Sequence, residues 1–517
     1  MLLAILTAPV EARAHQADTA APLSDAATRN STIVSLLEQS HELDQQFSPS
    51  VHLDLLSRQA SLVSQIPGER SSELTRFWAD ELFALSAQVQ QPRRSALQSS
   101  ALSILARLDP PRALELLRTA QWPESGPPSP KRQLAQRVFS VLVNSDGVNA
   151  LPLLQQEADR MGQEGQYPYA ALGMAASYAV AKDWGVNPQH ARAVLRSVFE
   201  PAFARYSQSS PDYPNDYDFG EMLKFVAGGL PFEVIQPALR TLVKNLLAAD
   251  TGKYHFQAHA LRSDGEDLQA DNAIDAALAW FGSLINRDPE LVQQLEDARP
   301  QLVPILECYK TNLCRGGSFG RVGAVQKPRV IDRDAETRAA ALRLSHTDPD
   351  LAISKVESLP DDGKRAATTL EVARGVAGNH PEQAAQLIDR TQGTMGSEDQ
   401  GKQLNLISAQ VSVAAAQNQQ EEVRRLLQRG FALAGPLISE SQAPLVLSFA
   451  SGLMPMVQIG AQNDPDLTIA FLQSLPPLRI KAELLLAAAT AMQMPVKLPI
   501  GSRKPTANPL TSPVGKP

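Results

Sequence analysis

Tyrosines and carboxylates are concentrated in residues 205–221, a stretch rich in Ser, Pro and Asp. This composition predicts a long loop, and the loop holds Tyr213, Asp216, Tyr217 and Asp218. Aromatic rings offer stacking area and carboxylates offer acceptors, as in binding sites for sugars, cations or peptides. Paired carboxylates would also suit the acid and base of a glycosidase. The favoured interpretation is nevertheless a long connection that folds back on its neighbours, with the tyrosines as anchors.

Two histidines, His255 and His259, lie four residues apart in the segment His-Phe-Gln-Ala-His. On a helix they would share one face, as metal-ligating histidines do. Phe256 stands where a zinc protease has its glutamate, so no general base accompanies the pair. The pattern favours two surface histidines, with a metal site as the weaker alternative, and the sequence predicts no cofactor.

Residues 316–320 read Gly-Gly-Ser-Phe-Gly and match the G-x-S-x-G form of a hydrolase nucleophile. Such a serine needs a strand before it and a helix after it. Here the segment follows a cysteine and precedes Arg321-Val322-Gly323. We therefore expect a flexible linker over 315–334 and no catalytic residue in it.

The chain has two cysteines, Cys308 and Cys314. Six residues apart on one helix they would point in different directions, so pairing requires a turn between them. A disulfide is expected if the protein resides in an oxidising compartment, and two free thiols if it does not. The short apolar start, followed by Ala12-Arg13-Ala14, resembles a signal peptide whose cleavage site follows Ala14. No basic residue precedes the apolar run, so a frayed apolar terminus is the alternative, but export to the periplasm or medium is expected.

The composition limits which classes of binding partner are expected. The 517 residues carry a net charge of -7, which argues against a general nucleic-acid binder. No apolar run approaches the roughly 20 residues of a membrane-spanning helix. Aromatic residues make up only 5% of the chain, whereas sugar clefts usually need stacking platforms. These features favour a protein or peptide partner.

Helical signals dominate the chain, and one of them recurs. Residues 348–360 and 464–476 are identical at eight of thirteen positions, beginning Asp-Pro-Asp-Leu and ending Ser-Leu-Pro. The aspartate can cap a helix whose first position the proline occupies. Weaker copies begin at Asp109, Asp288 and His380. The two best copies lie 116 residues apart, which leaves room for three helix pairs of about 39 residues each.

Residues 335–490 resemble the tetratricopeptide-like class of helical repeats. The resemblance rests on the capped helix after Asp348-Pro349, the small residues around Ala366 and Ala373, and the new helix after His380-Pro381. The Trp, Gly and Tyr positions of that class are not filled. The resemblance implies stacked antiparallel helix pairs, an all-α superhelix (solenoid) of the TPR or HEAT type, and no specific family.

The expected plan is a possible signal peptide at 1–14, a helical array at 25–204, the loop at 205–221, helices at 222–314, a linker at 315–334, helical repeats at 335–490 and a disordered proline-rich tail at 494–517. No convincing strand is found. The favoured function is an exported scaffold of the cell envelope that binds a protein or peptide, and this interpretation is favoured over an enzyme. The alternative is a periplasmic hydrolase or lyase that acts on a polysaccharide.

Overall fold

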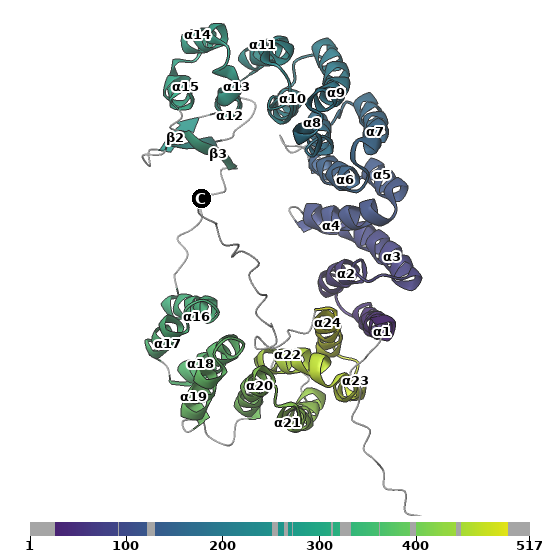
Figure 1. The fold of residues 1–517 in the computed structure, drawn as a ribbon, viewed down its shortest axis with the longest axis vertical. Coiled ribbons are helices and arrows are strands. Elements are labelled where there is room, and N and C mark those ends of the chain that lie inside the picture. Colours follow the sequence, from purple (N-terminus) through teal and green to yellow (C-terminus); the bar gives the residue numbers. More distant parts are fainter. Residues whose placement is uncertain are drawn as a thin grey trace, which may run out of the picture. The chain divides into compact units, whose positions relative to one another are not determined.

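The structure is a computed structural model of the chain. It describes residues 26–90, 93–120, 130–250, 257–262, 267–270, 272–311, 314–320, 332–360, 362–392, 400–440 and 446–494. The fold is all-α in class, as the sequence predicts, with one small sheet (Figure 1). Among the described residues, no helix combines the length and the apolar character that crossing a membrane requires. The predicted signal peptide at 1–14 and the tail at 495–517 lie outside the described residues.

The chain divides into two compact units, and each is described by itself. Unit 1 contains Met1–Leu55 and Ile331–Pro517, and unit 2 contains Leu56–Val330. Helix α2 (Pro49–Val63) spans the boundary between the units.

The helices of unit 2 are α3 (Glu69–Ser86), α4 (Arg93–Leu108), α5 (Pro110–Thr119), α6 (Pro130–Asp146), α7 (Leu151–Gln163), α8 (Tyr169–Ala179), α9 (Pro188–Gln208), α10 (Tyr213–Val226), α11 (Phe232–Ala248), α12 (Ala273–Trp280), α13 (Gly282–Ile285), α14 (Pro289–Ala298) and α15 (Val303–Lys310). Short 3-10 helices lie at Gly147–Ala150, Asp183–Gly185 and Pro300–Leu302. The strands are β1 (Gln257–Arg262), β2 (Asp267–Ala270) and β3 (Cys314–Gly320).

The helices of unit 1 are α1 (Ala26–Asp44), α16 (Arg333–Leu344), α17 (Pro349–Glu357), α18 (Asp362–Ala377), α19 (Pro381–Gln392), α20 (Gln400–Ala416), α21 (Gln420–Glu440), α22 (Val446–Asn463), α23 (Pro465–Ser474) and α24 (Arg479–Gln493). The odd-numbered helices α17, α19, α21 and α23 begin 32, 39 and 45 residues apart. Three helix pairs therefore separate the two best repeat copies, as predicted, although the pairs differ in length.

In both units the even-numbered helices pack against one another and form a continuous row. In unit 2 the row runs α4–α6–α8–α10, and in unit 1 it runs α16–α18–α20–α22–α24 and ends on α1. Odd-numbered helices such as α5, α7 and α9 cover the other side of the row in unit 2 (Figure 1). The contact between α24 and α1 includes a buried hydrogen bond of 2.9 Å from Ser40 Oγ on α1 to the carbonyl oxygen of Ala482 on α24. The first helix of the chain thus completes the stack of the last ones.

Small residues allow the even-numbered helices to approach closely. A Cβ atom on Gly173 of α8 would lie 2.8 Å from Cγ of Met222 on α10. A Cβ atom on Gly452 of α22 would lie 2.7 Å from Oδ1 of Asn405 on α20. A side chain at either position would push two backbones apart, so glycine is needed for the close approach.

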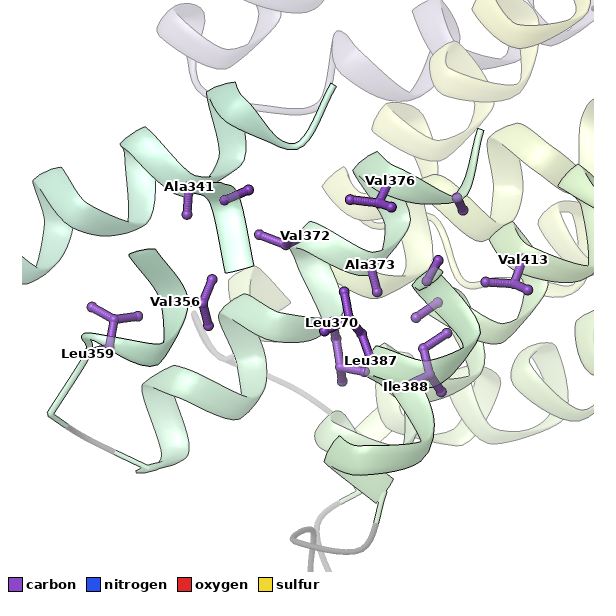
Figure 2. Packing of buried hydrophobic residues seen from close by; sticks show 14 residues of the cluster. Ala341, Val356, Leu359, Leu370, Val372, Ala373, Val376, Leu387, Ile388 and Val413 are labelled. Atoms are coloured by element: carbon purple, nitrogen blue, oxygen red, sulfur yellow. The ribbon is translucent and has the colours of Figure 1, made fainter. Parts of the chain in front are cut away.

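Each helix pair buries its apolar side only against its neighbours. Figure 2 shows one such cluster, to which five successive helices contribute. Ala341 comes from α16, Val356 from α17, Val372 from α18, Leu387 from α19 and Val413 from α20, and all five are buried. Because one pair alone would leave these side chains in water, the stack is a condition of stability.

The predicted aspartate caps are confirmed. Asp348 Oδ1 accepts a hydrogen bond of 3.1 Å from the backbone N–H of Leu351, and Asp464 Oδ1 accepts one of 3.2 Å from that of Leu467. Asp109 and Asp288 cap α5 and α14 in the same way, each followed by proline. Asn187 caps α9 before Pro188, a copy that the search for Asp-Pro pairs missed.

Three of these caps also form ion pairs with an arginine on an earlier odd-numbered helix. The N–O distances are 3.6 Å for Arg76 with Asp109, 2.7 Å for Arg240 with Asp288 and 3.2 Å for Arg424 with Asp464. Each of these carboxylates therefore caps its own helix and also links that helix to an earlier odd-numbered helix.

The expectation that the chain has no strand is wrong. Strand β1 pairs antiparallel with β2 and with β3, in the order β2–β1–β3. The partners β1 and β3 are far apart in the sequence, and neither carries the β-branched residues that mark a strand locally. The pairing is therefore a tertiary effect that local patterns do not show. Strand β3 also takes the place of the first part of the expected linker at 315–334.

Cys308 on α15 is buried and disulfide-bonded. The only other cysteine of the chain is Cys314, the first residue of β3. A disulfide between the two, as expected for an oxidising compartment, joins the helical part of unit 2 to its sheet.

We expect Asp464→Ala to lower the free energy of unfolding by about 1 kcal/mol, because it removes the cap of α23. Asp464→Asn keeps a capping oxygen and should cost less. The measurement is urea unfolding followed by circular dichroism. The matched control is Asp466→Ala, two residues on and exposed. Equal losses for Asp464→Ala and the control would contradict a structural role for the cap.

Candidate functional site

The expected loop at 205–221 is wrong, because most of it is helical. Helix α9 continues to Gln208 and α10 begins at Tyr213, so only residues 209–212 connect them. Pro214 lies in the first turn of α10, where its missing N–H costs nothing, and Asp216 in the same turn faces the positive end of the helix dipole. The buried residues Phe219, Leu223 and Val226 continue the helical spacing. The segment 205–221 contains the end of α9 and the start of α10, so neither helical pattern is complete within it.

Residues 213–218 point to different neighbours, since successive helical positions are about 100° apart. Tyr213 is buried, and its hydroxyl donates a hydrogen bond of 2.9 Å to the carbonyl oxygen of Ala273 on α12. Asp216 Oδ1 accepts a bond of 2.7 Å from the hydroxyl of Tyr206 on α9 and one of 3.4 Å from Nδ2 of Asn245 on α11. Both residues therefore hold α10 to its neighbours.

Asp218 reaches the opposite side, toward α8. The N-cap residue of α8 is Pro168, which provides no side-chain cap. Asp218 Oδ2 accepts a hydrogen bond of 3.3 Å from the N–H of Ala170, in the first turn of α8. A carboxylate from another helix thus satisfies a free donor at the α8 N-terminus and faces the positive end of its dipole.

Arg132 on α6 completes this polar contact. Its Nη1 donates a hydrogen bond of 2.7 Å to the carbonyl oxygen of Pro214, and its Nη2 donates to Oδ1 of Asn215. Its Nε lies 3.9 Å from Asp218 Oδ2 and has no hydrogen-bond partner within the described part of the chain. One guanidinium therefore joins α6 to the first turn of α10 and faces the carboxylate that serves α8.

Burial governs the ionisation of both aspartates. Removal from water raises the pKa of Asp216 to about 6, although the hydrogen bonds from Tyr206 and Asn245 act in the opposite direction. Burial likewise raises the pKa of Asp218 to about 6, opposed mainly by the positive charge of Arg132. Burial thus raises the pKa of both aspartates above the usual range, although their side chains lie on opposite sides of α10.

A pocket of about 420 Å³ opens between α6, α8 and α10, on the even-numbered row of unit 2. It is lined by Arg132, Gln133, Gln136, Arg137 and Ser140 of α6, by Ala170, Met174 and Tyr178 of α8, and by Tyr217, Asp218 and Glu221 of α10. Of the four predicted binding residues, the structure places Tyr217 and Asp218 at this pocket, whereas Tyr213 and Asp216 face other helices.

Glu221 forms the end of the pocket nearest α12. It accepts a hydrogen bond from Nε1 of Trp280, and Nζ of Lys224 lies 3.9 Å from its Oε1. The Lys224 ammonium also lies 3.4 Å from the centre of the Trp280 ring, a cation–π contact. Burial lowers the pKa of Lys224, and the charge of Glu221 opposes that shift. The indole and the carboxylate thus position this lysine next to the pocket.

This arrangement is better suited to binding than to catalysis. A glycosidase needs two carboxyl groups placed on either side of the bond that breaks. The carboxylates at the pocket are Asp218 and Glu221; Asp218 serves the α8 N-terminus and Glu221 receives the indole N–H. The exposed side chains are of a different kind: Tyr178, Arg137 and Gln133. They offer an aromatic ring and hydrogen-bond donors, as a recognition site does.

The other sequence candidates lie elsewhere. His255 is outside the described residues, and His259 lies in β1, where its backbone pairs with Gln269 and Ser318. The helical placement of His259 was therefore wrong. Ser318 of the G-x-S-x-G segment lies inside β3, and no strand-to-helix turn occurs there. In the described residues no group of three or more His, Cys, Asp or Glu side chains could hold a metal ion.

The sequence analysis missed Arg132, Arg137 and Tyr178. Arg132 had a detectable signal, because a charged residue falls on the same helical face as the buried Ala135, Val138 and Phe139. Arg137 and Tyr178 gave no such signal, because their place at the pocket depends on the contact between α6 and α8.

Asp216→Asn should change how stability depends on pH. A carboxyl whose pKa is raised on folding stabilises the fold below the unfolded value near 3.8, and this stabilisation disappears as the pH rises through about 6. The stability of the variant relative to wild type should therefore increase between pH 4.5 and 7.5, by up to about 2 kcal/mol. Urea unfolding across this range measures it.

The control for that prediction is Asp146→Asn, an exposed aspartate at the end of α6. Its difference from wild type should change little over the same range. A pH-independent difference for Asp216→Asn would contradict a raised pKa at that position.

Comparison with known proteins gives no relative: no family model matches the chain, and no curated protein or solved structure matches it.

Proposed function

We propose that the chain is a helical-repeat scaffold of the cell envelope that binds a protein or peptide segment on the even-numbered row of unit 2. The pocket between α6, α8 and α10 would be the anchoring point. The main support for this proposal is that three successive even-numbered helices contribute to one pocket of about 420 Å³. This volume lies within the usual range of about 300–1,000 Å³ for ligand sites.

The rim of the pocket supports this proposal. Tyr178 is 48% exposed at the rim, where a tyrosine can give a partner both a ring face and a hydroxyl. The floor is made of side chains locked by hydrogen bonds between helices, so a partner would not have to order it on binding. Stacked helical repeats commonly use such surfaces for extended partners.

The rival proposal, a hydrolase or lyase that acts on a polysaccharide, is less well supported. Its acid and base would have to come from Asp216, Asp218 or Glu221. Asp216 faces Tyr206 and Asn245, away from the pocket lining, and the other two carboxylates hold neighbouring groups.

Photo-cross-linking in the native host tests the binding surface. Tyr178 is replaced by benzoyl-phenylalanine, and the control replaces Phe77, an exposed aromatic residue on the odd-numbered helix α3. We expect one reproducible protein partner, identified by mass spectrometry, to be linked at position 178 and not at 77. The purified partner should then bind the full chain with a defined affinity. Links only to glycan, or equal links at both positions, would contradict the proposal.

A location in the oxidising cell envelope predicts the state of the cysteines. The disulfide of Cys308 should be present in protein isolated from the host with its thiols trapped by alkylation. Mass spectrometry should show no alkylated cysteine without prior reduction and two after it. Reduction should cost roughly 2 kcal/mol of stability at most, since the closed loop is short. Two alkylated cysteines without reduction would contradict export.

A further inference from the structure

The carboxylates at the pocket are already neutralised by neighbouring groups. Asp218 faces Arg132 and the N-terminus of α8. Glu221 receives the Trp280 indole N–H and lies next to Lys224. Neither carboxylate therefore leaves a strong negative charge for a cationic ligand to neutralise.

The donors at the pocket, in contrast, have too few acceptors. Arg132 Nε has no hydrogen-bond partner in the described part of the chain, and this side chain is only 6% exposed. A buried donor without an acceptor destabilises the fold, and a ligand oxygen at that place would supply the missing hydrogen bond. Among the described residues, the hydrogen-bond partner of Gln136 Nε2 is the sulfur of Met174, at 3.3 Å, and a thioether is a weak acceptor.

Arg137 adds a positive charge at the mouth of the pocket. It is exposed on α6 and forms no ion pair with any described residue. Gln133 and Ser140 lie four residues before it and three residues after it, so the three side chains follow one face of α6. This face presents one positive charge and several polar groups and no carboxylate.

We propose that this pocket takes the carboxylate of an acidic segment in a protein partner, an inference that rests on the proposed peptide-binding function. Arg137 would meet the carboxylate at the mouth, and the Arg132 Nε–H would provide a donor deeper in the pocket. A guanidinium matches a carboxylate through two parallel hydrogen bonds, which makes the recognition directional. The Tyr178 ring would contact the aliphatic part of the same segment.

The test uses the full chain and three probes. The first is a fluorescent eight-residue peptide of alternating Glu and Gly with blocked ends. The second has Gln in place of Glu. The third is trigalacturonate, a sugar carboxylate that competes with the labelled peptide. Fluorescence anisotropy measures binding at low and at physiological salt.

The acidic peptide should bind wild type, and Arg137→Gln should weaken it about tenfold, the size of one charge-assisted hydrogen bond. Arg192→Gln removes the same charge from the exposed surface of α9 and should leave the affinity unchanged. Salt should weaken binding to wild type more than binding to Arg137→Gln, because ions screen the charge at the mouth. The affinity of wild type for the Gln peptide should be no higher than the affinity of Arg137→Gln for the Glu peptide.

Three results would overturn this inference: no binding of the acidic peptide, equal binding of the Glu and Gln peptides, or equal loss in the two arginine variants. Tighter binding of trigalacturonate than of the peptide would transfer the site to a polysaccharide. The proposed scaffold function is tested separately, since protein cross-links at position 178 that persist in Arg137→Gln would support it while contradicting the acidic partner.

Discussion

The candidate site depends on the contacts that the buried guanidinium of Arg132 makes with α10 and with Asp218. It is almost wholly buried, it bonds the first turn of α10, and it faces the carboxylate of Asp218 that serves the first turn of α8. A buried charge is tolerated only when its partners are fixed, and loss of one partner commonly costs about 3–5 kcal/mol. This requirement holds α6, α8 and α10 in one arrangement, and the pocket is the space that this arrangement leaves.

Helix α10 extends this polar contact to the rest of unit 2. Its tyrosine, aspartate and glutamate side chains bond to α9, α11 and α12 through Tyr206, Asn245, Ala273 and Trp280. Consecutive positions on one helix thus contact neighbours on several sides. The concentration of Tyr and Asp in this segment is therefore explained first by packing between helices. The proposed binding uses the side chains that line the pocket.

Local signals in the sequence were sufficient for much of the fold. The Asp-Pro caps and the recurring segments at 348 and 464 are read within a few residues, and the structure places helix starts there. The sheet depends on a pairing between β1 and β3, which are separated in the chain by the four helices α12–α15, and no local pattern indicates such a pairing. The prediction of the site was incomplete for the same reason. The composition of residues 213–218 marked the right helix, but the neighbour that each side chain contacts depends on which helix lies beside it.

The packing of α1 on α24 affects how the chain can fold during its synthesis. The first residue of α24 is made 435 residues after the last residue of α1. At about 5–20 residues per second, α1 would wait about 20–90 s for this partner. Meanwhile the part of its apolar side that α24 later covers stays exposed to chaperones and to other chains. All residues of unit 2 are synthesised before the second segment of unit 1. The helices of unit 2 can therefore pack before the two segments of unit 1 meet.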